Sequence, residues 1–257
     1  VDELDTGKHT AQELNTLRNT WLGRSGAWVD GWTGRQPGRP VHAKLVAGMS
    51  LLERSLEKAV ELGGEWLYET KLTGPQAEAA MERVVSQQKL MMEQRFLREG
   101  HAFASMRAAA HFSVEAAMNE RCSGVSYYHF LCGLQEEADW AGLGRRLEAL
   151  REKVLGGNAL TVSRHGSDAA LDTLKKLLPG SAFAAGERRA AVPYREALAP
   201  AVNEAFVIDG GVNYDVLAWP MERRLERKVL ARVMSYEYLW HSIREVGGAY
   251  GTGMVTQ

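Results

Sequence analysis

The chain has 257 residues, and its 45% hydrophobic share is enough to bury a core in one large domain or two smaller ones. Its 31 Lys and Arg residues nearly cancel its 32 Asp and Glu residues, so no overall field would attract nucleic acid or an anionic membrane. No apolar run approaches the roughly 20 residues of a membrane-spanning helix, and the segment contains no secretory signal. With two cysteines and no CxxC pair, these features predict a soluble protein of a reducing compartment, either a bacterial cytoplasm or an organelle matrix.

The first predicted element is a helix that begins after Thr10. Glu13 lies three residues on, and this spacing is typical of a capping box. Residues 27–32 and 41–47 then show strand character on either side of a basic segment, 33–40, that is rich in Gly and Pro. This arrangement predicts a β-hairpin with a long turn.

A series of helices is predicted after the hairpin. Apolar residues recur at helical spacing in segments 50–62, 75–97, 101–110, 113–121, 125–134, 140–155 and 167–178. Glycines set the predicted boundaries: Gly63 and Gly64 end the first helix, Gly100 ends the second, and Gly124 separates two of the shorter ones. Residues 160–163 predict a strand before the last helix.

A change of texture divides the chain. Residues 179–200 are rich in Ala, Arg, Gly and Pro and have no sustained period, so we interpret them as a linker between domains. Residues 1–178 are then a helix-rich first domain, and residues 201–257 open a second domain in the order β-β-α-β. The predicted fold class is α+β, with an antiparallel sheet and helices packed on one of its faces.

The second domain is expected to contain three strands and one long helix. Residues 204–209 and 213–218 have strand character. The helix begins near Pro220 and ends at Gly247-Gly248, after which Ala249 starts a returning strand.

Several kinds of chemistry find no motif in this chain. The seven histidines are scattered, without the i, i+4 spacing of a helical zinc site, so no metal ligand is predicted here. A Walker phosphate loop, a strand-linked dinucleotide turn and the G-x-S-x-G elbow of serine hydrolases are also missing from the sequence.

One group of residues permits two interpretations. Arg244 stands in the last predicted helical turn, Gly247-Gly248-Ala249 follow it, and Tyr250 starts the next strand. In the simpler interpretation Arg244 complements the helix dipole and the glycines form a left-handed cap. In the other, the turn brings a cation and a phenolic donor together, so that they hold a substrate carbonyl and stabilise the oxyanion formed when water attacks it.

At these residues the chain resembles the presequence protease branch of the pitrilysin and insulinase superfamily of zinc metallopeptidases. The resemblance is carried by Leu230-Ala231-Arg232, Met234, Leu239, Ile243-Arg244-Glu245 and Gly247-Gly248-Ala249-Tyr250-Gly251. Earlier segments stand in the order found in that family: Asp5-Thr6-Gly7-Lys8-His9-Thr10 with Glu13-Leu14, Gly100-His101-Ala102-Phe103-Ala104 with Arg107, residues 124–131, and Val212-Asn213-Tyr214. The likeness therefore covers nearly the whole chain.

The resemblance implies a function and a place in a larger molecule. Members of the family enclose a chamber between two homologous halves: the N-terminal half binds zinc through an inverted His-x-x-Glu-His motif, and the C-terminal half supplies an Arg and a Tyr that reach the substrate. By resemblance Arg244 and Tyr250 are that pair, and the other expected substrate-binding residues are Gly247, Gly248, Ala249, Val212 and Asn213. The zinc ion is expected outside this chain.

On this view the chain is most of the third domain, the linker and the opening of the fourth domain of a zinc endopeptidase that degrades unfolded peptides. It is expected to be truncated at both ends and inactive alone, with the N-terminal zinc-binding half as its partner. Unpaired strand edges then predict self-association.

Two alternatives stay open. The chain could come from a non-catalytic homologue or partner subunit that binds peptides or assembles with an active half, or from an unrelated α+β scaffold with a coincidental turn.

Overall fold

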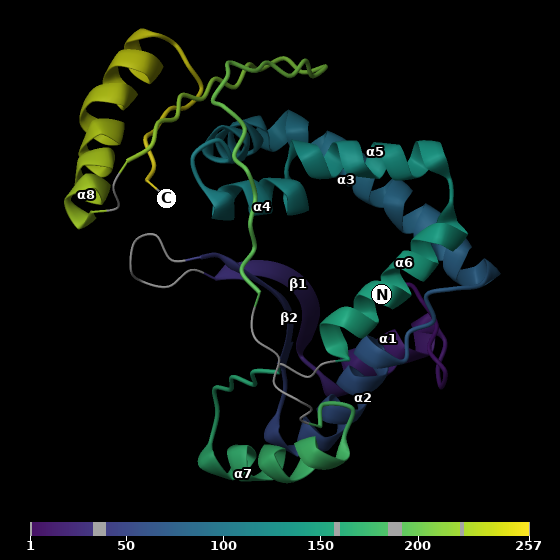
Figure 1. Cartoon of the computed structure of the whole chain (residues 1–257). Coiled ribbons are helices and arrows are strands. Elements are labelled where there is room, and N and C mark those ends of the chain that lie inside the picture. Colours follow the sequence, from purple (N-terminus) through teal and green to yellow (C-terminus); the bar gives the residue numbers. More distant parts are fainter. Residues whose placement is uncertain (1, 33–39, 157–159, 185–191, 222–223, 257) are drawn as a thin grey trace. The chain divides into compact units, whose positions relative to one another are not determined.

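A computed structural model describes residues 2–32, 40–156, 160–184, 192–221 and 224–256 (Figure 1). Two compact units are present, residues Val1–Leu217 and Ala218–Gln257. The predicted hairpin turn at 33–39 and the middle of the predicted linker, 185–191, lie outside the described residues. The predicted linker falls within the first unit, and the predicted domain boundaries stay a prediction.

Helix α1 (Ala11–Trp21) confirms the predicted capping box. The Thr10 hydroxyl accepts a hydrogen bond from the Glu13 amide at 3.3 Å, and the Glu13 carboxylate accepts one from the Thr10 amide at 2.9 Å. Leu14 is buried and forms a small core with Leu62 and Trp66. The cap therefore sets where α1 begins, and this core fixes the face that it turns inward.

The predicted hairpin is confirmed. Strands β1 (Arg24–Trp32) and β2 (His42–Ser50) pair antiparallel, in a register that runs from Arg24 opposite Ser50 to Trp32 opposite His42. A Cβ atom added at Gly31 would lie 2.5 Å from the Met118 methyl carbon, so helix α4 (Val114–Ser123) packs closely on β1. The fold class is thus α+β, helix-rich, with a two-stranded sheet in the described part of the chain.

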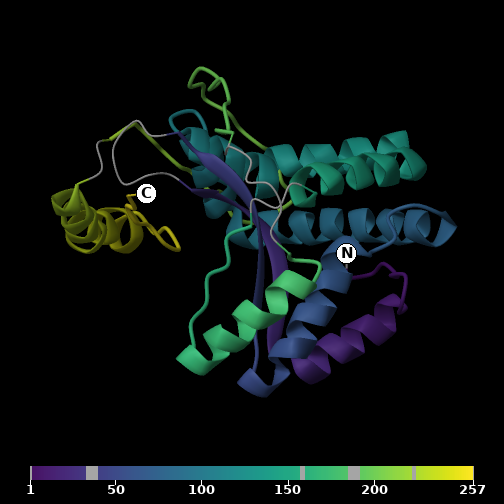
Figure 2. The ribbon, with the colours of Figure 1, turned by 60° about the horizontal axis from the view of Figure 1, so that its bottom comes forward.

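Helix α2 (Leu56–Tyr68) follows a single 3₁₀ turn, η1 (Glu53–Ser55), and runs through Gly63 and Gly64. The prediction that these glycines end the helix was wrong. A Cβ atom at Gly63 would lie 2.4 Å from the Met49 methyl carbon, and one at Gly64 would lie 3.0 Å from the Ala182 Cβ. The glycines therefore admit β2 and a later segment close to the helix, as Figure 2 shows for β2.

Helix α3 (Pro75–Ala109) replaces two predicted helices, so the expected stop at Gly100 was also wrong. The helix bends at Glu99, whose backbone is non-helical (φ −125°, ψ 25°). Next to the bend, the Tyr214 hydroxyl donates to the Leu97 carbonyl at 2.8 Å, and a Cβ atom at Gly100 would lie 2.3 Å from the Tyr214 ring. Gly100 leaves room for a side chain that takes over a helix carbonyl, which is a known cause of kinks.

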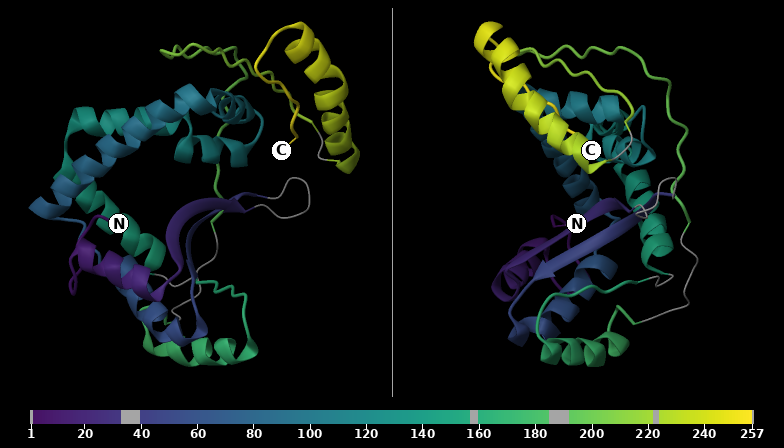
Figure 3. Two further views of the ribbon diagram at one scale, coloured as in Figure 1. Left: turned by 180° about the vertical axis from the view of Figure 1, so that it is seen from behind. Right: turned by 90° about the vertical axis from the view of Figure 1, so that its left-hand side faces the viewer.

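The remaining helices of the first unit are α4, α5 (Val125–Glu137), α6 (Trp140–Leu155) and α7 (Asp168–Leu177), followed by the 3₁₀ turn η2 (Leu178–Gly180). Gly124 separates α4 from α5 as predicted, whereas the strand predicted at 160–163 does not form. Helix α3 packs against α4, α5 and α6, and α7 packs against α2 (Figure 3). The largest core joins α3 to α5 through Val85, Met92, Phe103, Leu131 and Leu134.

The second unit contains one long helical element. Helix α8 (Leu225–Val233) continues into the π-helix η3 (Met234–Val246), which confirms the predicted helix, although it begins five residues after Pro220. The strands predicted at 204–209, at 213–218 and after Ala249 do not form, because these segments have no neighbouring strand to pair with in the described part of the chain. None of the described helices is both long and apolar enough to cross a membrane.

Candidate functional site

The predicted turn at the end of η3 is a left-handed glycine cap. Gly248 has φ 74°, and its amide donates to the Arg244 carbonyl at 3.1 Å. The Ala249 amide donates to the Ile243 carbonyl, also at 3.1 Å. These bonds satisfy carbonyls that a helix end otherwise leaves free, and only glycine adopts such a φ without strain.

Arg244 lies against an aromatic ladder along the outer face of this helix. Its guanidinium carbon is 4.1 Å from the centre of the Trp240 ring. The Trp240 ring stacks on Tyr236 with centroids 6.5 Å apart, and the Arg232 guanidinium caps the other end, 4.9 Å from the Tyr236 ring. A cation over an aromatic face is attracted by the ring quadrupole, so Trp240 restricts where the Arg244 side chain points. The i, i+4 spacing of these four residues is visible in the sequence and could have revealed the ladder.

Tyr250 follows the cap and is 93% exposed. Within the described part of the chain its hydroxyl has no hydrogen-bond partner, and Arg244 is paired with Trp240 and not with Tyr250. Val212 and Asn213 are exposed and belong to the first unit, whereas the cap belongs to the second. The joint role expected of these residues stays a prediction.

After the cap the chain turns back along its own helix. The Ser235 hydroxyl accepts a hydrogen bond from the Met254 amide at 2.8 Å and bonds the Ala231 carbonyl at 2.7 Å. These contacts close residues 249–253 into a loop in the place of the predicted strand. Ser235 carried no signal in the sequence that would have predicted this contact.

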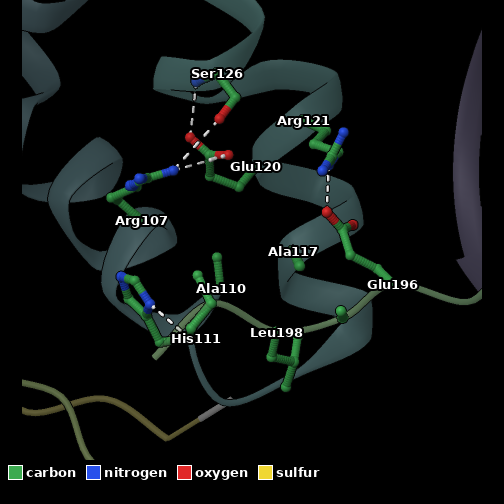
Figure 4. Close-up of a pocket in the computed structure, with 11 residues that line it drawn as sticks. Arg107, Ala110, His111, Ala117, Glu120, Arg121, Ser126, Glu196 and Leu198 are labelled. Carbon is green, nitrogen blue, oxygen red and sulfur yellow. Dashed lines mark hydrogen bonds and ion pairs between the residues drawn. The ribbon is translucent and has the colours of Figure 1, made fainter. Parts of the chain in front are cut away.

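The first unit has a second polar site, a cavity of about 150 Å³ between the end of α3, helix α4 and residues 196–199 (Figure 4). Arg107 of α3 donates to both carboxylate oxygens of Glu204 at 2.8 Å and lies 3.5 Å from a Glu120 oxygen. The Ser126 amide donates to Glu120 at 2.8 Å, and Arg121 pairs with Glu196. The hydrogen bond from Arg107 lowers the pKa of Glu204, and the same contact raises the pKa of Arg107.

These residues carry no metal chemistry that we can derive. Among the described residues, no group of three or more His, Cys, Asp or Glu side chains could hold a metal ion. The zinc implied by the resemblance therefore has no ligand set in the described part of this chain, and we derive no step through it.

Comparison with known proteins identifies the family. Residues 1–134, more than half of the chain, match the family described as associated with peptidases of metallopeptidase family 16, subfamily C. Presequence protease 1, chloroplastic/mitochondrial, from Arabidopsis thaliana is 27% identical over 97% of this chain and 23% of its own length. Protein HypA from Clostridium perfringens is 23% identical over 78% of the chain and 21% of its own length. The mitochondrial presequence protease of Eremothecium gossypii is 29% identical over 60% of the chain and 17% of its own length.

The chain thus spans less than a quarter of the length of these three relatives, at 23%, 21% and 17%. The Arabidopsis match extends well beyond the region of the family match and includes part of the second unit, since it covers 97% of the chain. From these matches, the chain belongs to this peptidase-associated family and is similar to part of the presequence proteases.

Proposed function

We propose that this chain is part of a zinc endopeptidase that degrades unfolded peptides, and that it supplies Arg244 and Tyr250 to the substrate. The main support is the family membership together with a match over 97% of the chain to a presequence protease. The geometry of the helix end is compatible with this role: Tyr250 is open to solvent, and Arg244 leaves the helix one turn earlier.

The two side chains suit a carbonyl that is under attack by water. Both are hydrogen-bond donors, and the guanidinium of Arg244 adds a permanent positive charge. As the carbonyl oxygen gains negative charge, such donors bind it more strongly than they bind the ground state, which lowers the barrier. Gly247, Gly248 and Ala249 leave room beside them for a peptide backbone, and Val212 and Asn213 are proposed as further substrate contacts.

The metal and the remaining partners are proposed to lie outside this chain. The N-terminal half of the whole protein would hold the zinc ion, and this chain would form part of the opposite wall of a chamber. Alone, the chain is then expected to be inactive. The printed names of the relatives place those proteins in mitochondria or chloroplasts, which supports an organelle matrix or a bacterial cytoplasm for this one.

The test is Tyr250→Phe in the whole protein that contains this chain. Loss of one oxyanion donor should cost about 2–4 kcal/mol of transition-state stabilisation, seen as a lower kcat on an unfolded peptide with little change in KM. Tyr238→Phe is the matched control, because Tyr238 is also exposed and lies on η3, away from the cap.

An unchanged kcat in Tyr250→Phe would refute the role of Tyr250. Peptide binding by a whole protein that has no hydrolytic activity would favour the non-catalytic alternative.

A further inference from the structure

Residues 194–204, which we call the strap, are held on the first unit at three points. The Tyr194 amide donates to the Val41 carbonyl at 2.8 Å, beside the hairpin. Farther along, Glu196 pairs with Arg121, and Glu204 receives two hydrogen bonds from Arg107. The strap therefore has defined contacts although it contains no regular secondary structure.

His111, just after α3, lies beneath the strap with a side chain that is only 7% exposed. Its Nδ1 atom is 3.2 Å from the Ala199 carbonyl oxygen (Figure 4). A carbonyl can only accept, so Nδ1 carries the proton in this contact. In the neutral imidazole the other ring nitrogen, Nε2, then presents a lone pair.

That lone pair faces the wrong partner. Nε2 is buried without a hydrogen bond, and the nearest carboxylate oxygen, on Glu204, lies 3.6 Å away. A lone pair opposite a carboxylate is unfavourable, and a buried acceptor without a donor costs free energy. Protonation of Nε2 would replace this contact with an N–H group that points at a negative charge.

The surrounding charges favour that proton. Charged side chains come from every described element around His111: Arg107 on α3, Glu120 and Arg121 on α4, and Glu196 and Glu204 on the strap. Three carboxylates and two guanidinium groups leave a net charge of one negative unit. Because an imidazolium brings the cluster to neutrality, the repulsion from the two arginines is outweighed.

We propose that protonation of His111 tightens the strap onto α3 and α4, so that the strap is a clasp that responds to pH. When His111 is neutral, the strap keeps only its arginine pairs and its backbone contact with Val41. When His111 is charged, it bonds the strap twice, through the Ala199 carbonyl and the Glu204 carboxylate. Arg107 keeps Glu204 ionised in both states.

The experiment measures hydrogen exchange of the Tyr194 amide in this chain by NMR, corrected for the intrinsic pH dependence of exchange. Imidazole groups ordinarily change charge between about pH 5 and 8, so the comparison is between about pH 5.5 and pH 8. Protection should be about three- to tenfold greater at the lower pH, since one charged hydrogen bond is gained in a partly screened site. Equal protection at both values would overturn the proposal.

Two variants assign the effect to its residue. His111→Gln should remove the pH dependence, whereas His165→Gln, the same change at an exposed histidine, should keep it. A pH dependence that survives in His111→Gln would also overturn the proposal. If His111→Gln does not fold, the wild-type chain still decides: the imidazole signal of His111 and the protection of Tyr194 should share one midpoint, and two separate midpoints would refute the link.

Discussion

The substitution Gly144→Ala should destabilise the first unit, although alanine is the better helix former. Gly144 is buried within α6, where this helix crosses the segment before α3. A Cβ atom at this position would lie 2.2 Å from the carbonyl oxygen of Leu72 and 3.4 Å from the Thr73 methyl carbon. The blocking atom at 2.2 Å belongs to the backbone, so relief requires α6 or residues 72–73 to move by roughly 1 Å.

Gly133→Ala, in α5, is the matched control. No atom lies within 4 Å of a Cβ placed there. The control should therefore gain the helix propensity of alanine, about 0.5–1 kcal/mol. At Gly144 the same gain is opposed by overpacking of about 1–3 kcal/mol, and the 2.2 Å contact with a rigid group argues for the upper part of that range. The net change there should be a loss of about 1–2 kcal/mol.

Urea denaturation followed by circular dichroism at about 222 nm measures both variants under the same conditions. The urea midpoint should fall for Gly144→Ala and rise for Gly133→Ala, with similar m-values. A midpoint for Gly144→Ala at or above that of the wild type would show that α6 does not approach Leu72 as closely as described.

Three further predictions use the same denaturation assay. Thr10→Ala should cost about 1 kcal/mol, because it removes the side chain that caps α1, and an unchanged midpoint would argue against the capping box. Met118→Ala should cost about 2–5 kcal/mol, since this side chain is 2% exposed and fills the space beside Gly31; a loss well under about 1 kcal/mol would contradict that packing. Arg107 lowers the pKa of Glu204 in the folded chain, so this carboxylate stabilises the fold above its ordinary pKa of 4.5, and the contribution disappears as the pH falls through the lower folded value. Glu204→Gln should accordingly weaken the acid dependence of the midpoint below about pH 4.5, and an identical acid profile would refute this pairing.

Local signals in the sequence predicted elements well. Thr10 and Glu13 define a helix start through bonds between residues three apart, and Gly247-Gly248 define a helix end in the same local way. The hairpin also followed from strand character on both sides of a Gly- and Pro-rich segment. In each case the stabilising partner lies a few residues away or in the adjacent strand, so the pattern contains both members of the interaction.

Glycines inside helices were misinterpreted for the opposite reason. Gly63 and Gly100 looked like helix stops, yet each makes room for a side chain that is distant in the sequence, Met49 in one case and Tyr214 in the other. A composition rule cannot separate a glycine needed for its backbone freedom from one needed for its missing side chain. The absent strands after residue 200 have a similar cause, since strand character becomes a strand only where a partner strand is present, and the described part of the chain offers none there.

The candidate sites divide in the same way. The Arg244 cap follows from consecutive residues and was predicted as a turn, while the orientation of Arg244 depends on Trp240, four residues earlier. The bond between Arg107 and Glu204 joins residues 97 positions apart, and no pattern in the sequence indicates it. Prediction of that cluster required the path of the strap over α3.

The bend in α3 has a consequence for the order of events during synthesis. The Tyr214 hydroxyl that occupies the Leu97 carbonyl stands 117 positions after it in the chain. The ribosome therefore releases all of α3 well before the residue that completes its bent form, and chains fold progressively from the N-terminus as they emerge. Until Tyr214 arrives, the nascent helix is free to run straight through Glu99, and its final bent shape is set only when most of the first unit has already been translated.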